Sequence, residues 1–196
     1  MIIQIGEWVL RNAFQQAAYW NRDLGKNITF AVNVSAYQLV DQKFRAMISA
    51  LIAEYNIDPR WIELELTETA VMDDLKTIKD TLFYLSDLNF TIVIDDFGTG
   101  YSMLSYLKKL PVHALKIDLE FVRDIQENES SAAIVQAIIG LAKNFDLKVV
   151  AEGVETKEQE QFLLNNQCRY AQGYLYSKPL CQKELAMYVD AIGVVE

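Results

Sequence analysis

The chain has 196 residues, of which 52% are hydrophobic, and its formal net charge is −9 at pH 7. This length fits one domain with a sizeable core. The negative charge excludes a binder of duplex nucleic acid, since that mode of binding depends on neutralising phosphates with basic side chains. An anionic ligand would therefore need a divalent cation as a bridge.

The two cysteines, Cys168 and Cys181, lie outside any CxxC pattern or His/Cys cluster. We expect reduced, partly buried thiols, as in cytosolic proteins. No apolar run reaches the roughly 18 residues of a membrane span, and the first residues lack the basic region of a signal peptide. The sequence thus predicts a soluble, cytoplasmic protein.

Six segments place apolar residues at the spacing of an amphipathic helix. In chain order, these predicted helices cover residues 5–20, 37–55, 75–88, 132–145, 158–164 and 185–192. Six short β-branched or apolar runs alternate with them, at 28–35, 61–68, 90–97, 113–118, 147–154 and, less clearly, 170–177. Such alternation is typical of parallel strands joined by crossover helices.

Six strands do not match either common α/β architecture. A (β/α)8 barrel has eight strands and usually about 250 residues. An open doubly wound sheet suits six, but the Gly-rich loop after its first strand is absent. The chain also opens inside a helical pattern. We therefore predict a single α/β domain over 1–196, a TIM-like (β/α)8 barrel that lacks about its first two strands.

Polar residues follow the predicted strands one after another, where each strand ends. They are Asn33, Glu65 with Glu68, Asp95 with Asp96, Lys116 with Asp118, Glu152 with Glu155, and Gln172. In a parallel barrel these ends meet on one face, which is where barrel active sites lie. Crowded carboxylates repel one another and resist desolvation. Mg²⁺ or Mn²⁺, which prefer oxygen ligands, relieve that cost, and two such ions can activate water against a phosphodiester.

Each of these residues also has an ordinary structural interpretation. Glu68 and Asp118 can cap the helices that follow them, and Glu152 and Glu155 flank a glycine in a strand-to-helix turn. Asp95 and Asp96 are the hardest pair to explain this way, because they end an apolar run and precede FGTG. His113 is the only histidine, so His-based triads and His-rich zinc sites are disfavoured. We interpret it as structural or exposed.

Five motifs resemble those of EAL-domain cyclic di-GMP phosphodiesterases in order and approximate spacing. They are ELTE (65–68), DDFGTGYS (95–102), LKID (115–118), AEGVET (151–156) and QGYLYSKPL (172–180), with support from IGEWVL (5–10) and NVS (33–35). The resemblance covers essentially the whole chain. It implies an EAL-type barrel and metal-dependent hydrolysis of one phosphodiester of cyclic di-GMP, giving linear pGpG.

The resemblance also implies roles for individual residues. The implied ligands of the two Mg²⁺ or Mn²⁺ ions are Asn33, Glu65 and Asp95 for one, and Asp95 and Asp96 for the other. Among the further implied catalytic residues, Lys116 holds or polarises the attacking water, and Glu152 and Gln172 support the metal–water network. Glu68 braces the loop 97–102, and Glu155 has a similar supporting role. The implied substrate-binding residues are Tyr101, which follows the glycine hinge and can meet a ligand base, and Asp118.

The chain departs from the family pattern at its start. Members of the family carry about 50 further residues with two strands and an E-x-L-x-R motif, whose Glu is a metal ligand and whose Arg contacts substrate. Nothing in this chain replaces either residue, since Glu7 lies in a helical segment. Met103 also stands where the family usually has Ser. We therefore expect weak binding of one metal ion, low turnover and an unclosed sheet that favours association between copies.

Three functions stay open at this point. One is a phosphodiesterase domain within a longer protein that carries sensor or GGDEF domains and forms homodimers. The others are a receptor that binds cyclic di-GMP without hydrolysis, and a module that mediates only protein interaction or dimerisation. Both alternatives predict losses scattered through the catalytic set. Every catalytic position after the absent segment is present, which favours the enzyme.

Overall fold

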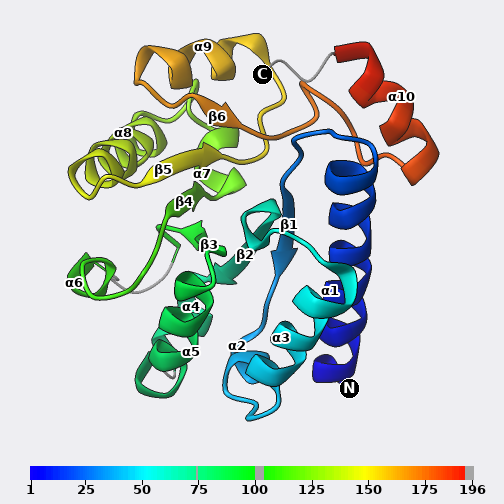
Figure 1. Cartoon of the computed structure of the whole chain (residues 1–196). Helices are drawn as coiled ribbons and strands as arrows, with labels where there is room; N and C mark the ends of the chain where they lie inside the picture. The colour runs from blue at the N-terminus through cyan, green and yellow to red at the C-terminus, as the bar shows by residue number, and fades with distance from the viewer. Residues whose placement is uncertain (74, 100–103, 193–196) are drawn as a thin grey trace.

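The computed structural model describes residues 1–73, 75–99 and 104–192. Within these residues, strands pair only in parallel and each strand pairs with the next one in the sequence. The strands are β1 (Phe30–Asn33), β2 (Ile62–Thr67), β3 (Thr91–Phe97), β4 (Ala114–Ile117), β5 (Lys148–Ala151) and β6 (Tyr170–Ala171). Figure 1 shows them following one another along a curved sheet, from blue β1 to orange β6, with helices around the outside.

The helices occupy the segments between the strands. They are α1 (Ile2–Ala17), α2 (Ala36–Leu39), α3 (Phe44–Tyr55), α4 (Glu68–Asp73), α5 (Leu75–Asp87), α6 (Leu104–Leu107), α7 (Leu119–Arg123), α8 (Glu129–Asn144), α9 (Lys157–Asn165) and α10 (Gln182–Ile192). A π-helical turn (Ala18–Asp23) extends α1, and a 3-10 turn (Pro59–Trp61) precedes β2. Across the described part of the chain, no helix is both long and apolar enough to span a membrane.

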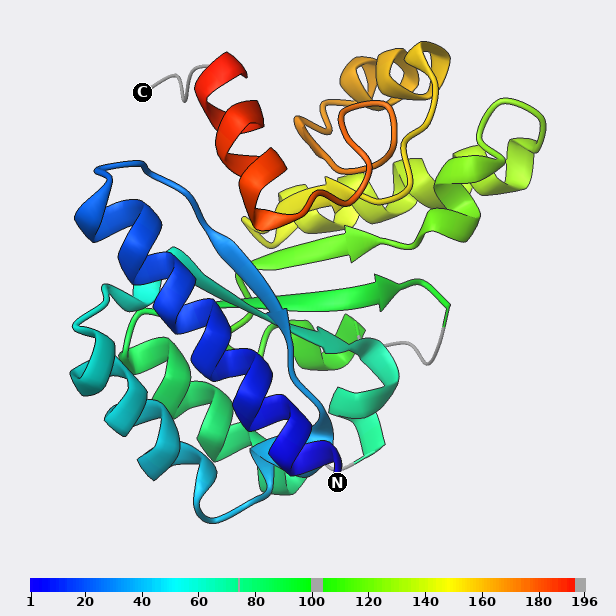
Figure 2. The same cartoon turned by 90° about the vertical axis from the view of Figure 1, so that its right-hand side faces the viewer.

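The strand order distinguishes a barrel-type sheet from a doubly wound one. A doubly wound sheet reverses its order at a switch point, whereas here the spatial order is the sequence order throughout. The sheet also curls as it goes from β1 to β6 (Figure 2). The predicted α/β fold with barrel-type winding is therefore confirmed. The six strands are two fewer than a closed (β/α)8 barrel has, and β1 and β6 are the ends of the sheet.

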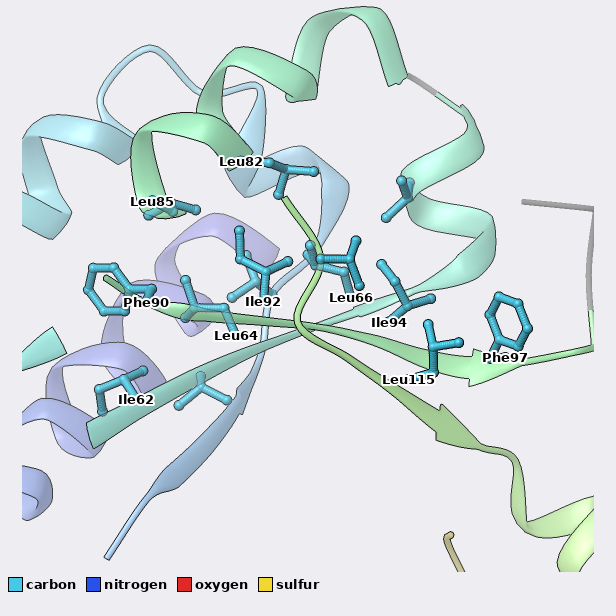
Figure 3. Close-up of a cluster of buried hydrophobic side chains, with 14 of the residues drawn as sticks. Ile62, Leu64, Leu66, Leu82, Leu85, Phe90, Ile92, Ile94, Phe97 and Leu115 are labelled. Atoms are coloured by element: carbon cyan, nitrogen blue, oxygen red, sulfur yellow. The ribbon is translucent and has the colours of Figure 1, made fainter. Parts of the chain in front are cut away.

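The two faces of the sheet differ in chemistry because side chains alternate along each strand. One face of β2 and β3 carries fully buried apolar residues such as Leu64 and Ile92, which pack against Leu82 and Leu85 of α5 (Figure 3). The other face carries Glu63 and the strand-end polar groups. The outer face therefore supplies the core, while the inner face is left free for polar side chains.

Two predicted elements differ from the structure. The helical pattern over 37–55 is divided into α2 and α3, and α2 is a one-turn helix that starts at a capping box formed by Ser35 and Gln38. The run 170–177 gives only the two-residue strand β6. The chain turns at Gly173, where a Cβ would lie 2.2 Å from the carbonyl oxygen of Val154, so only glycine fits at that position.

The two cysteines lie in different environments. Cys168 is 4% exposed, and burial raises the pKa of its thiol. Cys181 is exposed just before α10. Both thiols are free, as predicted, but partial burial of both was wrong, because Cys181 precedes the surface helix α10 while Cys168 packs beneath β6.

We expect the two thiols to differ in reactivity, because a buried thiol with a raised pKa forms little thiolate and is poorly accessible to reagents. At pH 8, a colorimetric disulfide reagent should modify one cysteine quickly in the folded protein and the second only after denaturant is added. The variant Cys181→Ser should lose the fast phase. Fast modification in that variant would show that Cys168 is accessible and would contradict this arrangement.

Candidate active site at the carboxyl ends of the strands

A β-bulge at the end of β3 places two carboxylates next to each other. Ile94 pairs with Leu115 and Phe97 with Ile117, so Asp95 and Asp96 together face the single residue Lys116 of β4. Asp96 has a φ of +54°, in the left-handed region that Asp tolerates better than most residues. Because a bulge changes the direction of side chains, two successive residues can both reach the inner face instead of alternating.

Glu152, just beyond β5, joins these two carboxylates. Asp95, Asp96 and Glu152 each offer one carboxylate oxygen, and the three oxygens lie within 4.8 Å of one another. Gln172, which follows β6, donates from Nε2 to Glu152 Oε1 at 2.6 Å and holds that carboxylate in place. This donor set consists of oxygens from three acidic residues, which suits a hard divalent cation.

Lys116 contacts carboxylates from three neighbouring strand ends. Its Nζ lies 2.9 Å from Glu65 Oε1, 3.2 Å from Asp95 Oδ1 and 2.6 Å from Glu152 Oε1. The residue is only 5% exposed. Burial lowers the pKa of its ammonium, but hydrogen bonds to Glu152 and Glu65 raise it more, so the net pKa lies above the ordinary value. Lys116 is therefore a charged group inside the sheet.

The carboxylates around Lys116 are themselves costly to keep ionised. Burial raises the pKa of Glu152, although Lys116 opposes that shift. Burial, the charge of Asp95 and a hydrogen bond with Asp118 all raise the pKa of Asp96. Burial and neighbouring negative charge both disfavour the ionised carboxylates, and a bound cation relieves that cost.

Two further acidic residues support the segments around the cluster. Glu68, at the start of α4, is 3% exposed and its Oε2 accepts a hydrogen bond from the backbone N–H of Gly98 at 3.2 Å. Gly98 has a φ of +101°, which favours glycine. Asp118 caps α7 by accepting from the N–H of Glu120 at 2.6 Å. Its carboxylate is thus engaged in capping, and a role in substrate binding stays a prediction.

The remaining predicted site residues are less closely engaged. Asn33 pairs in register with Glu65 but its side chain is exposed. Glu155 is exposed, and its backbone N–H donates to Gln159 Oε1, so its predicted supporting role is not seen in a contact with the cluster. Tyr101 and Met103 lie outside the described residues.

Sequence reasoning missed a cavity of about 690 Å³ beside Asn33. Its lining comes from three separate parts of the chain, with Ile5 and Val9 of α1, Ser35 and Tyr37 around α2, and Thr67 at the end of β2. The apolar spacing in α1 indicated a helix but not which element it faces. Only the packing of α1 against α2 reveals the cavity, so no local signal could have predicted it.

Comparisons with known proteins give a consistent result. A family model described as EAL domain matches residues 1–179. The cyclic di-GMP phosphodiesterase PdeR of Escherichia coli is 38% identical over 180 residues, which are 92% of this chain and 27% of that protein. The chain spans about a quarter of the length of the curated relatives that it matches.

Two solved structures show the same fold. A complex of the PaMucR phosphodiesterase with c-di-GMP has a TM-score of 0.89 and 40% identity, over 94% of this chain and 74% of that one. A manganese and cyclic di-GMP complex of Klebsiella pneumoniae BlrP1 has a TM-score of 0.80 and 30% identity, over 90% of this chain and 45% of that one.

Replacing Glu68 should test the contact that ties α4 to the end of β3. In Glu68→Ala, the N–H of the exposed Gly98 loses the buried carboxylate that accepts from it, and we expect the free energy of unfolding to fall by about 1–3 kcal/mol, as for a hydrogen bond to a charged group. Glu129→Ala is a matched control, because Glu129 also lies in the first turn of a helix but is exposed. Its loss should stay under about 1 kcal/mol. Urea denaturation measures both, and equal losses would contradict the bracing role.

Proposed function

The chain belongs to the EAL domain family, and from that premise we propose that it is a metal-dependent phosphodiesterase domain that hydrolyses cyclic di-GMP to linear pGpG. The observation that carries the proposal is the cluster of Asp95, Asp96 and Glu152 around one point beside a buried lysine. Family resemblance alone would fit a domain that had lost its chemistry. The chain retains the carboxylates that can bind metal and the buried ammonium of Lys116, which favours a hydrolytic enzyme over an inactive domain.

The proposed ions are two Mg²⁺ or Mn²⁺. Asp95, Asp96 and Glu152 would hold one of them through carboxylate oxygens. Asn33 and Glu65, adjacent in the β1–β2 register, would hold the other together with Asp95. When bound, such ions polarise a phosphodiester and lower the pKa of an attacking water. The all-oxygen donor set fits these hard cations rather than soft ones.

The remaining residues would position the reacting groups. Lys116 would hold a water against the cluster after one of its carboxylate contacts opens, because its Nζ lies within 3.2 Å of three carboxylates and an ammonium has only three N–H donors. Gln172 keeps Glu152 oriented through a 2.6 Å hydrogen bond. Glu68 accepts from the backbone N–H of Gly98, three residues before Tyr101 in the sequence. Tyr101 and Asp118 are proposed to contact the substrate, and Glu155 to play a supporting role.

Family membership supports two further proposals about assembly. One is a homodimer. The other is that sensor or GGDEF domains accompany this domain in a longer protein, in line with relatives about four times as long as the matched segment.

Hydrolysis and its dependence on metal test the function directly. Incubated with cyclic di-GMP and Mn²⁺, the chain should release pGpG slowly, and a chelator should stop the reaction. Asp96→Asn should lower the rate by more than about a hundredfold, because the cation loses a charged ligand. Asp146→Asn is the matched control, since Asp146 also has positive φ but is exposed and remote from β3. Chromatography of the products measures both.

Two outcomes would contradict the proposal. Binding of cyclic di-GMP without any product in Mn²⁺, both by this chain and by a version extended at its N-terminus, would favour the receptor. Equal rates for Asp96→Asn and the wild type would show that the metal cluster takes no part in the reaction. A version extended at its N-terminus to include an E-x-L-x-R segment, assayed in parallel, tests whether that Glu raises turnover as the family resemblance implies.

A further inference from the structure

Lys116 and the proposed metal ions would use the same carboxylates. The ammonium is within 3.2 Å of oxygens of Glu65, Asp95 and Glu152. Asp95 and Glu152 also belong to the group whose oxygens converge within 4.8 Å, and Glu65 is a proposed ligand of the other ion. Each carboxylate that contacts Lys116 is thus one that a divalent cation needs.

The contact is built into the sheet. Lys116 is 5% exposed, and its side chain extends from the central strand β4. The partners come from both sides of β4. Asp95 lies on the adjacent strand β3, Glu65 on the next strand β2, and Glu152 just beyond the adjacent strand β5. Because the side chain is almost fully buried, the ammonium has little access to solvent in this arrangement.

Like charges at such distances repel strongly where water is largely excluded. A divalent cation that binds Asp95 and Glu152 is repelled by the positive charge of Lys116, because the ammonium contacts the same two carboxylates. Binding therefore requires the ammonium to give up part of its contacts with these oxygens.

We propose that Lys116 is the resident counter-cation of the metal-free site and competes with the divalent cation, so that metal binding is an exchange of carboxylate contacts between ammonium and metal. This inference rests on the metal-dependent part of the proposed function. It adds that Lys116 sets the threshold of cation concentration at which the site fills, in addition to any part in holding water.

The alternatives make different predictions for a variant without the charge. If Lys116 only positions a water, removing it lowers turnover and leaves cation affinity unchanged. If it is only structural, removing it weakens the site and lowers affinity. Under competition, removing the charge weakens the metal-free protein but raises its affinity for the cation, a combination that neither alternative gives.

Calorimetric titration with Mn²⁺ separates these cases without measuring turnover. Lys116→Met should bind Mn²⁺ about tenfold more tightly than the wild type, because the competing charge is gone. The metal-free variant should unfold at lower urea than the wild type, and saturating Mn²⁺ should restore more of its stability. Lys116→Arg keeps the charge and should not gain the affinity that Lys116→Met gains, although the two side chains differ in shape.

Lys148→Met is the matched control. Lys148 begins the neighbouring strand β5 but is exposed, and its Nζ lies 5.7 Å from the ring of Tyr170. Removing its charge should leave Mn²⁺ affinity near the wild-type value. If Lys148→Met raised the Mn²⁺ affinity as much as Lys116→Met does, the effect would come from net charge alone. That result would overturn the proposed exchange of contacts.

The outcomes keep this inference apart from the function it rests on. Wild-type protein that binds Mn²⁺ as tightly as, or more tightly than, Lys116→Met would overturn the exchange while leaving the metal site intact. Absence of Mn²⁺ binding in both would overturn the metal site itself, and the exchange with it. Binding by Lys116→Met alone would support the exchange in its strongest form.

A measurement on the wild type covers the case in which Lys116→Met does not fold. Buried, hydrogen-bonded lysine ammonium groups give distinct ¹⁵N resonances. The Nζ resonance of Lys116 should shift during titration with diamagnetic Mg²⁺, while that of Lys148 stays in place. A Lys116 resonance that does not change as Mg²⁺ saturates the site would overturn the proposal.

Discussion

The contact between one buried ammonium and carboxylates from neighbouring strand ends is the interaction on which the site depends. Lys116 lies 2.6–3.2 Å from Glu65, Asp95 and Glu152. Without a positive charge among them, these buried acidic groups would repel one another and favour protonation or unfolding. The ammonium allows the fold to keep a dense group of oxygens without metal. Because it compensates them only in part, it also leaves them able to accept a cation.

The backbone provides the geometry that this contact needs. The bulge in β3 sets Asp95 and Asp96 against Lys116, and the left-handed conformation of Asp96 lets adjacent carboxylates converge. The outer face of the same strand is fixed by apolar packing around Ile92 (Figure 3). A rigid apolar layer on one side thus holds a crowded polar layer on the other, as preorganised sites require.

The strand alternation and the polar strand ends allowed much of this to be predicted. Parallel strands in sequence order bring Glu65, Asp95, Lys116 and Glu152 together because their ends share one edge of the sheet. The bulge in β3 was not predictable from the amino-acid sequence, since TIVIDDF fits an unbroken strand equally well. The start of α2 at the capping box of Ser35 and Gln38 is a local pattern that the helical spacing alone did not reveal. The cavity depends on tertiary packing, which local pattern does not fix.

The position of a bound cation tests the central claim most directly. Anomalous scattering from crystals of this chain soaked in Mn²⁺ should show an ion bonded to oxygens of Asp95, Asp96 and Glu152. In the same crystals, Lys116 Nζ should have moved away from Asp95 or Glu152 relative to metal-free crystals. An ion bound elsewhere, or one bound at the cluster with all three ammonium contacts unchanged, would contradict the account.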